Sequence, residues 1–232
     1  MGLRRLFINP AEACMSMEIE AKFPVHDFEP VRMRLAAVGA LYCTRMFEEN
    51  IVLDVKDKDR ATLREQKVLL RLRRNVSMNK AGDKAGGKVR EGAVETLLTV
   101  KLPPEATSGF AKVCRELETG VADFDAISQI LGVLGFIQAF SYEKIRETWE
   151  LEGCHICLDE VCFGLFVEIE GDEPSIMRAA ELLGLDLASA SDRNYHELNR
   201  EFRRAGNLPP QDSFTFPPAR GEAIRHELGI KK

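Results

Sequence analysis

Apolar and polar residues alternate along the stretch 17–23, which reads Met-Glu-Ile-Glu-Ala-Lys-Phe. Successive side chains of a strand point to opposite faces, so this stretch predicts a strand with one apolar face. The other face carries Glu18, Glu20 and Lys22. Two acids and one base on a stripe are ordinary where that face meets water. They become informative if similar stripes recur on strands that enclose a common space.

Similar patterns predict further strands, and most of these follow one another in hairpin succession. The expected strands are 17–23, 41–55, 68–75, 93–102, 111–120, 136–151, 154–161 and 165–171. Apolar residues at helical spacing predict helices at 27–39, 123–135, 174–184 and from about 192, with a turn and short helix at 54–64 and another short helix near 222–228. Strands interrupted by helices favour an α+β fold with a large antiparallel sheet or barrel, in one domain.

Charged residues on the polar faces of these strands are sorted by sign in pairs two residues apart. The acids are Glu18, Glu20, Glu116, Glu118, Asp159, Glu168 and Glu170, and the bases are Lys22, Arg71, Arg73, Lys101, Lys144 and Arg146. A solvated face is the ordinary explanation for any one strand, but cross-strand pairing on such a face tends to alternate signs. Sorted pairs inside a barrel would build an acidic zone and a basic zone, which are costly unless ligands neutralise them. The pattern therefore favours Mg²⁺ or Mn²⁺ on the acids together with a polyanion on the bases.

The order of these motifs resembles that of the CYTH superfamily, the triphosphate tunnel metalloenzymes. The resemblance covers Met17 to about Phe202 and rests on Glu18-x-Glu20-x-Lys22, Arg71-x-Arg73, Thr99-x-Lys101, Glu116-x-Glu118, Lys144-x-Arg146, Asp159 and the run 164–170. It implies an eight-stranded antiparallel β-barrel that forms a tunnel, with flanking helices. We accordingly expect a tunnel domain at 17–205, a loose N-terminal extension at 1–16, and a partly disordered C-terminal tail at 206–232.

The resemblance also implies roles for the charged residues. The metal ligands would be Glu18, Glu20, Asp159, Glu168 and Glu170. The triphosphate would be bound by Lys22, Arg71, Arg73, Lys101, Lys144 and Arg146. Glu116 and Glu118 would hold a second metal or orient these bases. The candidate catalytic residues are Lys22, Lys101, Arg146 and Tyr195, the last in a C-terminal segment that resembles the cyclase branch of the family.

Three functional hypotheses stay open at this point. The family joins class IV adenylyl cyclases, thiamine triphosphatases and inorganic tripolyphosphatases, so the first two hypotheses are a cyclase and a triphosphatase. In a cyclase, the ribose 3′-hydroxyl of ATP attacks the α-phosphate and pyrophosphate leaves. In a triphosphatase, water attacks the terminal phosphate. The segments around Gly135, Lys144 and Tyr195 favour the cyclase. A non-catalytic polyphosphate- or nucleotide-binding protein is the third hypothesis, and the intact acidic set argues against it.

Composition limits which classes of partner are expected and indicates the cellular compartment. The 232 residues carry a formal net charge of −5, which argues against a general nucleic-acid binder. No apolar run approaches the roughly 20 residues of a membrane helix, and the apolar core near the N-terminus is too short for a signal peptide. We expect a cytoplasmic protein with no nucleic-acid or membrane partner, and the resemblance makes a homodimer conceivable.

Two further motifs carry little weight. The run 82–88 has the glycine and lysine spacing of a phosphate-binding loop, but Val89 stands where Ser or Thr is required, so a mobile hairpin connection is expected at 77–92. Cys154, Cys157 and Cys162 could begin a metal clip, but no second Cys or His pair follows at the usual spacing. Reduced strand cysteines are the expectation.

Overall fold

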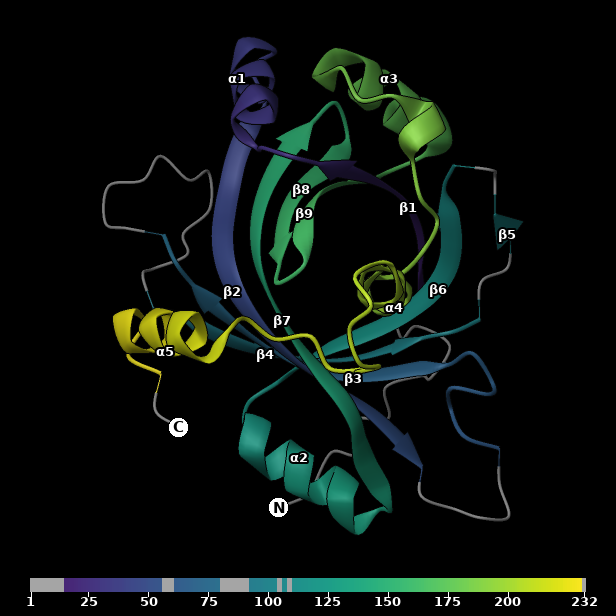
Figure 1. Cartoon of the computed structure of the whole chain (residues 1–232), viewed down its shortest axis with the longest axis vertical. Helices are drawn as coiled ribbons and strands as arrows, with labels where there is room; N and C mark the ends of the chain where they lie inside the picture. The colour runs from purple at the N-terminus through teal and green to yellow at the C-terminus, as the bar shows by residue number, and fades with distance from the viewer. Residues whose placement is uncertain (1–14, 56–60, 80–91, 104–105, 108–109, 231–232) are drawn as a thin grey trace, which may run out of the picture.

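The computed structural model describes residues 15–55, 61–79, 92–103, 106–107 and 110–230. Within this part of the chain nine strands form one antiparallel sheet, in the order β1-β9-β8-β7-β2-β3-β4-β6-β5. β1 also pairs with β6, which closes eight of the strands into a ring and leaves the short β5 outside it. The ring is seen nearly along its axis in Figure 1. The predicted eight-stranded antiparallel barrel with flanking helices is therefore confirmed.

The element bounds are close to those that the alternation predicts. The strands are β1 (Met15–Val25), β2 (Leu41–Val55), β3 (Leu69–Ser77), β4 (Val94–Lys101), β5 (Ala106–Thr107), β6 (Lys112–Val121), β7 (Phe136–Leu151), β8 (Cys154–Val161) and β9 (Gly164–Glu170). The helices are α1 (Glu29–Ala37), α2 (Phe124–Val133), α3 (Glu173–Leu183), α4 (Tyr195–Ala205) and α5 (Pro218–Glu227), with a single 3₁₀ turn at Leu187–Ser189. No helix among the described residues is long and apolar enough to cross a membrane.

Local sequence signals start and stop the helices. The Asp123 carboxylate accepts a hydrogen bond from the backbone N–H of Ala126 at the start of α2, which satisfies a donor that the helix itself cannot pair. Asn194 and Glu197 form a reciprocal capping box at the start of α4. Gly184 ends α3 with a φ of 63°, a conformation that glycine adopts without a steric penalty.

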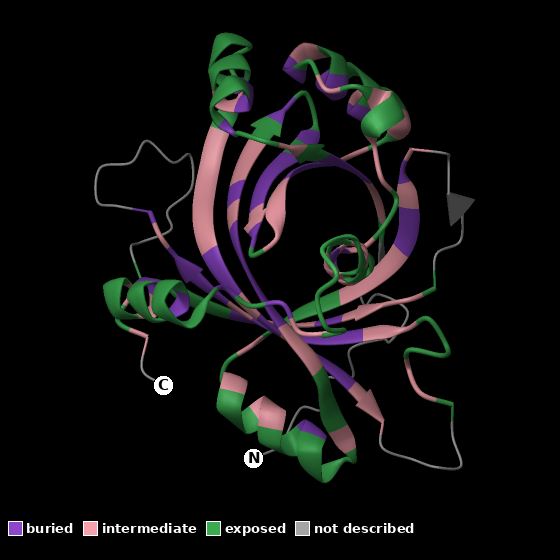
Figure 2. Cartoon of the chain, viewed as in Figure 1, coloured by how far each residue is buried: buried purple, intermediate pink, exposed green. Residues whose placement is uncertain are grey.

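The main apolar core lies outside the barrel wall, between the sheet and two helices. The outward side chains of β1, β8 and β9, including Phe23, Ile156 and Ile169, pack against α1 and α3 through residues such as Leu35 and Ile176. Figure 2 shows buried positions running along these strands, while the far sides of the helices are exposed. Because the apolar face of each strand is used on the outside, the charged face must point into the barrel.

The segment after Gly206 differs from the expected partly disordered tail. Phe214 forms a parallel bridge with Tyr142, and Phe216 stacks on Phe47 with ring centroids 6.4 Å apart. α5 follows, and Figure 1 shows it lying against the outside of the barrel beside β2. Phe214 lines the tunnel cavity, whereas Phe216 and Ile224 pack with Phe47 and Ile145, so the apolar residues of this segment follow no common period that a pattern could reveal.

Three other expectations fall wholly or partly on residues that lie outside the described ones: the loose extension at 1–16, the short helix within 54–64, and the hairpin connection with its glycine-lysine run at 77–92. The described part of 54–64 is strand and turn. β5 was not predicted, since a strand of two residues leaves no alternation to detect.

We expect Ile224→Ala in α5 to lower the free energy of unfolding by about 2 kcal/mol and the Tm by about 4–8 °C. Ile224 is 7% exposed and packs with Phe47 and Phe216, so the truncation leaves a cavity under the helix. Urea and thermal unfolding measure the change. Val133→Ala, at a position that is 88% exposed, is the matched control and should change stability by less than about 0.5 kcal/mol. Equal unfolding curves for the two variants would show that α5 does not pack against the barrel.

Candidate functional site

One cavity of about 1420 Å³ occupies the barrel interior, and the predicted charged motifs line it. Its described lining includes Glu18, Glu20, Lys22, Arg71, Arg73, Lys101, Glu116, Glu118, Lys144, Arg146, Glu168, Glu170 and Tyr195. The register explains the convergence, because motifs on neighbouring strands lie directly opposite one another. Lys22 faces Glu168 across β1 and β9, and Lys101 faces Glu116 across β4 and β6.

Three carboxylates gather where β1 and β9 meet. Glu18, Glu20 and Glu170 each offer an oxygen within 4.8 Å of the others. Burial and the neighbouring carboxylates raise the pKa of Glu170 to about 7, although Arg146 opposes this shift. Three oxygen donors at this spacing match the ligand preference of hard divalent cations, and such a cation would relieve the repulsion among them. This carboxylate cluster therefore fits a divalent metal.

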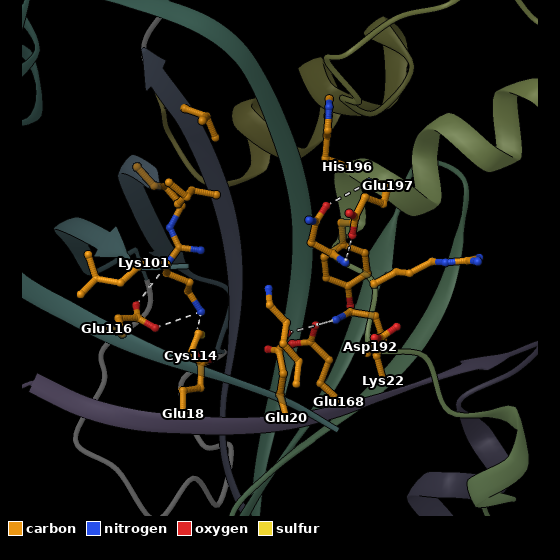
Figure 3. A pocket seen from close by; sticks show the side chains of 18 of the residues that line it. Glu18, Glu20, Lys22, Lys101, Cys114, Glu116, Glu168, Asp192, His196 and Glu197 are labelled. Atoms are coloured by element: carbon orange, nitrogen blue, oxygen red, sulfur yellow. Dashed lines mark hydrogen bonds and ion pairs between the residues drawn. The ribbon is translucent and has the colours of Figure 1, made fainter. Parts of the chain in front are cut away.

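Lys101 of β4 joins this cluster to Glu116 of the neighbouring strand β6. Its ammonium group is paired with the Glu18 carboxylate and lies 2.9 Å from Glu116 Oε2, as Figure 3 shows. Burial alone would lower the pKa of Lys101, but Glu18, Glu20 and Glu116 outweigh it and raise the pKa above its ordinary value. Lys101 therefore stays charged in the cavity and can attract an anion.

Lys22 occupies the middle of the tunnel beside α4. Its ammonium nitrogen lies 2.7 Å from Glu168 Oε1 and 4.7 Å from the centre of the Tyr195 ring. Burial opposes the charge, but Glu168 and Glu20 raise the pKa of Lys22 above its ordinary value. α4 appears end-on within the outline of the ring in Figure 1, and the capping box at its start fixes the position of Tyr195.

Asp159 binds bases rather than joining the carboxylate cluster. Its side chain is fully buried and accepts hydrogen bonds from Lys144 Nζ at 3.0 Å, Arg146 Nε at 2.7 Å and the Tyr195 hydroxyl at 2.8 Å. Asp159 is not among the described residues that line the cavity. Of the five carboxylates expected to bind metal, the structure brings three together; Asp159 and Glu168 lie outside this cluster and pair with Lys144, Arg146 and Lys22.

The acidic and basic zones expected from the sequence are interleaved instead of separate. Charges are sorted by sign along one strand, but the antiparallel register sets four of the six bases opposite an acid of a neighbouring strand: Lys22, Lys101, Lys144 and Arg146. Cross-strand pairing thus alternates signs within the tunnel just as it does on solvated faces.

The arginines of β3 are held by neutral groups as well as acids. Arg71 donates to the Tyr142 hydroxyl at 3.3 Å and to Thr99 Oγ1 at 3.2 Å, and it lies 3.6 Å from both Glu116 and Glu118. Burial raises the pKa of Tyr142, but the nearby cations, led by Arg71, lower it overall. Arg73 donates through Nε to Asn50 Oδ1 at 2.8 Å.

Two residues of β2 complete the site and were missed in the sequence. Glu48 is 2% exposed and Asn50 is 1% exposed, and both point to the inner face. Their spacing of two was the available signal. The pair is not like-signed, and both faces of the run 44–52 mix polar and apolar residues, so the faces of this long strand could not be assigned.

Together, fold and cavity define a closed antiparallel tunnel with a charged, ion-paired interior. The chain belongs to the CYTH domain family, whose model matches residues 16–194. The resemblance noted from the motifs is therefore confirmed. α4, α5 and the segment between them lie beyond the matched range.

Individual relatives agree with this family. The chain is 28% identical over 155 residues to "Putative adenylate cyclase MJ0240" of Methanocaldococcus jannaschii, which covers 66% of this chain and 76% of that protein. It is 25% identical to the solved structure of the PH1819 protein from Pyrococcus horikoshii OT3, with a TM-score of 0.59 over 79% of this chain and 98% of that one. A solved structure described as "a putative adenylate cyclase" from Vibrio parahaemolyticus is 21% identical, with a TM-score of 0.60 over 79% of this chain and 98% of that one, and this likeness shows the fold alone.

Proposed function

We propose that this protein is a divalent-metal-dependent enzyme that acts on a triphosphate held in the tunnel, and that it converts ATP to cyclic AMP and pyrophosphate. The observation that carries the proposal is the convergence of six cationic side chains and a three-carboxylate cluster on one cavity. Family membership supports a triphosphate substrate and a divalent metal. The name of the archaeal relative supports the cyclase reaction.

In this proposal Glu18, Glu20 and Glu170 hold Mg²⁺ or Mn²⁺. The ion, when bound, neutralises charge on the phosphate oxygens and orients the reacting phosphorus. The cations Lys22, Arg71, Arg73, Lys101, Lys144 and Arg146 bind the triphosphate, with Arg forks matching its oxygens.

Phosphoryl chemistry depends mostly on positioning and charge neutralisation, so these side chains supply much of the catalysis. As the ribose 3′-hydroxyl loses its proton to water and its oxygen bonds to the α-phosphorus, the bond from the α-phosphorus to the bridging oxygen of the β-phosphate breaks and negative charge grows on the leaving pyrophosphate. Lys101 and Arg146, both held charged by acidic neighbours, stabilise that charge.

The six triphosphate-binding cations form what we call the clamp, and Asp159 and Tyr195 act on this clamp rather than on the metal. Asp159 fixes Lys144 and Arg146 through its two oxygens, and Tyr195 holds Asp159 from α4. We assign the catalytic unit to 17–205, which contains every one of these side chains.

Product analysis tests the reaction. ATP, inorganic tripolyphosphate and thiamine triphosphate are incubated in parallel with the purified protein and Mg²⁺ or Mn²⁺, and products are separated by ion-exchange chromatography. Cyclic AMP with an equal amount of pyrophosphate is expected from ATP. Orthophosphate as the product would make the protein a triphosphatase, and tight binding without turnover would make it a binding protein.

Removal of the metal should abolish turnover of whichever substrate is processed. Excess EDTA withdraws the ion from the carboxylate cluster, and the repulsion among the three carboxylates is then left uncompensated. Restoring Mg²⁺ or Mn²⁺ should restore activity. Undiminished turnover in EDTA would exclude the metal-dependent mechanism.

A further inference from the structure

A buried acid lies beneath the phosphate-binding cations without lining the cavity. Glu48 Oε2 lies 3.3 Å from Arg73 Nε and 3.5 Å from Lys144 Nζ, and its Oε1 lies 3.8 Å from Arg146 Nε. Glu48 is not among the described residues that line the tunnel cavity, nor does it belong to the carboxylate cluster. Its role must therefore be exerted through the three cations.

These cations direct their hydrogen bonds elsewhere. Arg73 Nε donates to Asn50, while Lys144 and Arg146 donate to Asp159. Glu48 Oε2 is a buried oxygen with no hydrogen-bond donor. This oxygen thus interacts with Arg73 and Lys144 through charge, and the carboxylate as a whole lies within 4 Å of three cations.

The charge of Glu48 is firmly maintained. Burial would raise its pKa, but Arg73, Lys144, Arg146 and Arg71 outweigh the burial and lower the pKa to about 2. A buried charge is costly unless it is paired, and the three neighbouring cations supply that pairing for Glu48. Near neutral pH it cancels one positive charge of the clamp permanently.

We propose that Glu48 is an internal counter-ion that weakens the hold of the clamp on polyphosphate, so that a pyrophosphate product can leave. This inference rests on the proposed function, because it assumes that Arg73, Lys144 and Arg146 bind phosphate groups. Glu48 is a positioning residue: it acts on the charge and spacing of the cations and does not touch the ligand. Its negative charge repels any polyanion in the tunnel, at a range where the buried site screens little.

Binding of inorganic tripolyphosphate by isothermal titration calorimetry tests this directly. EDTA is present, so that no metal-dependent turnover occurs. Glu48→Gln should bind tripolyphosphate about tenfold more tightly than the wild-type protein, with a steeper loss of affinity as KCl is raised. Glu49→Gln is the matched control: Glu49 is the next residue of β2 and points outward to Arg74 and Arg225, so its loss should leave the affinity unchanged.

Kinetics give a second measurement that a purely structural role would not produce. For Glu48→Gln, KM and kcat should fall together, because substrate binds more tightly and product leaves more slowly. If this variant does not fold, Glu48→Asp serves instead. Its charge is drawn back from the cations, so tripolyphosphate should bind about two- to threefold more tightly.

The outcomes separate the two claims. A wild-type protein that does not bind tripolyphosphate overturns the phosphate clamp, and with it both the proposed function and this inference. A wild-type protein that binds, with equal or weaker binding by Glu48→Gln and Glu48→Asp, overturns the inference alone.

Discussion

Glu20→Gln is expected to lower turnover of the triphosphate by about 10²- to 10³-fold at saturating substrate, with the fold preserved. Glu20 is one of the three carboxylates that meet where β1 and β9 pair. Glutamine keeps the shape but removes the charge that a hard cation requires. The loss corresponds to roughly 3–4 kcal/mol of transition-state stabilisation, in the range expected for a metal that neutralises phosphate charge.

Steady-state kinetics over a titration of Mg²⁺ or Mn²⁺ measures this effect, and circular dichroism checks the fold. The apparent metal affinity should fall together with kcat. Glu29→Gln is the matched control, since the Glu29 side chain is 65% exposed on α1 and far from the tunnel wall. Wild-type turnover by Glu20→Gln would remove this residue from the metal site.

Asp159→Asn should lower the free energy of unfolding by about 3–5 kcal/mol and the Tm by about 10 °C or more. The substitution removes the anion that pairs with Lys144 and Arg146 inside the barrel wall, where Asp159 is fully buried. Two buried cations then lose a partner while the packing volume is kept. Activity should fall as well, because both cations belong to the proposed clamp.

Metal binding distinguishes this role from that of a ligand. Well below its Tm, Asp159→Asn should bind Mg²⁺ or Mn²⁺ within about threefold of wild type, since Asp159 lies outside the carboxylate cluster. A loss of metal affinity as large as that of Glu20→Gln would return Asp159 to the metal ligands. Calorimetric titration of the two variants in parallel gives the comparison.

Alternation along the chain predicted most of the barrel because the wall strands have an apolar face that packs in the outer core and a charged face that lines the cavity. Phe23 and Lys22 are adjacent in sequence, yet one belongs to the outer core and the other to the tunnel. The alternation with a period of two therefore predicted both the strand and which of its faces points into the tunnel. The charged motifs could be placed around one cavity on that basis.

Pairing between strands could not be predicted in the same way. The contact of Asp159 with Arg146 depends on the register of β7 and β8, which no single strand encodes. Glu48 was missed because both faces of β2 around it mix polar and apolar residues, so no alternation separates them. The packing of Phe214 and Phe216 was missed because isolated aromatic residues among prolines have no period, and their partners lie on distant strands.

Closure of the ring also has a consequence for how the protein is made. β1 emerges early from the ribosome but must wait for β6 and β9 before both of its edges are paired. Glu20 and Glu170 are brought opposite each other only by that last pairing. The proposed metal site therefore requires that β1 and β9 are paired, and an ion that bound there would favour the closed ring over its open precursors.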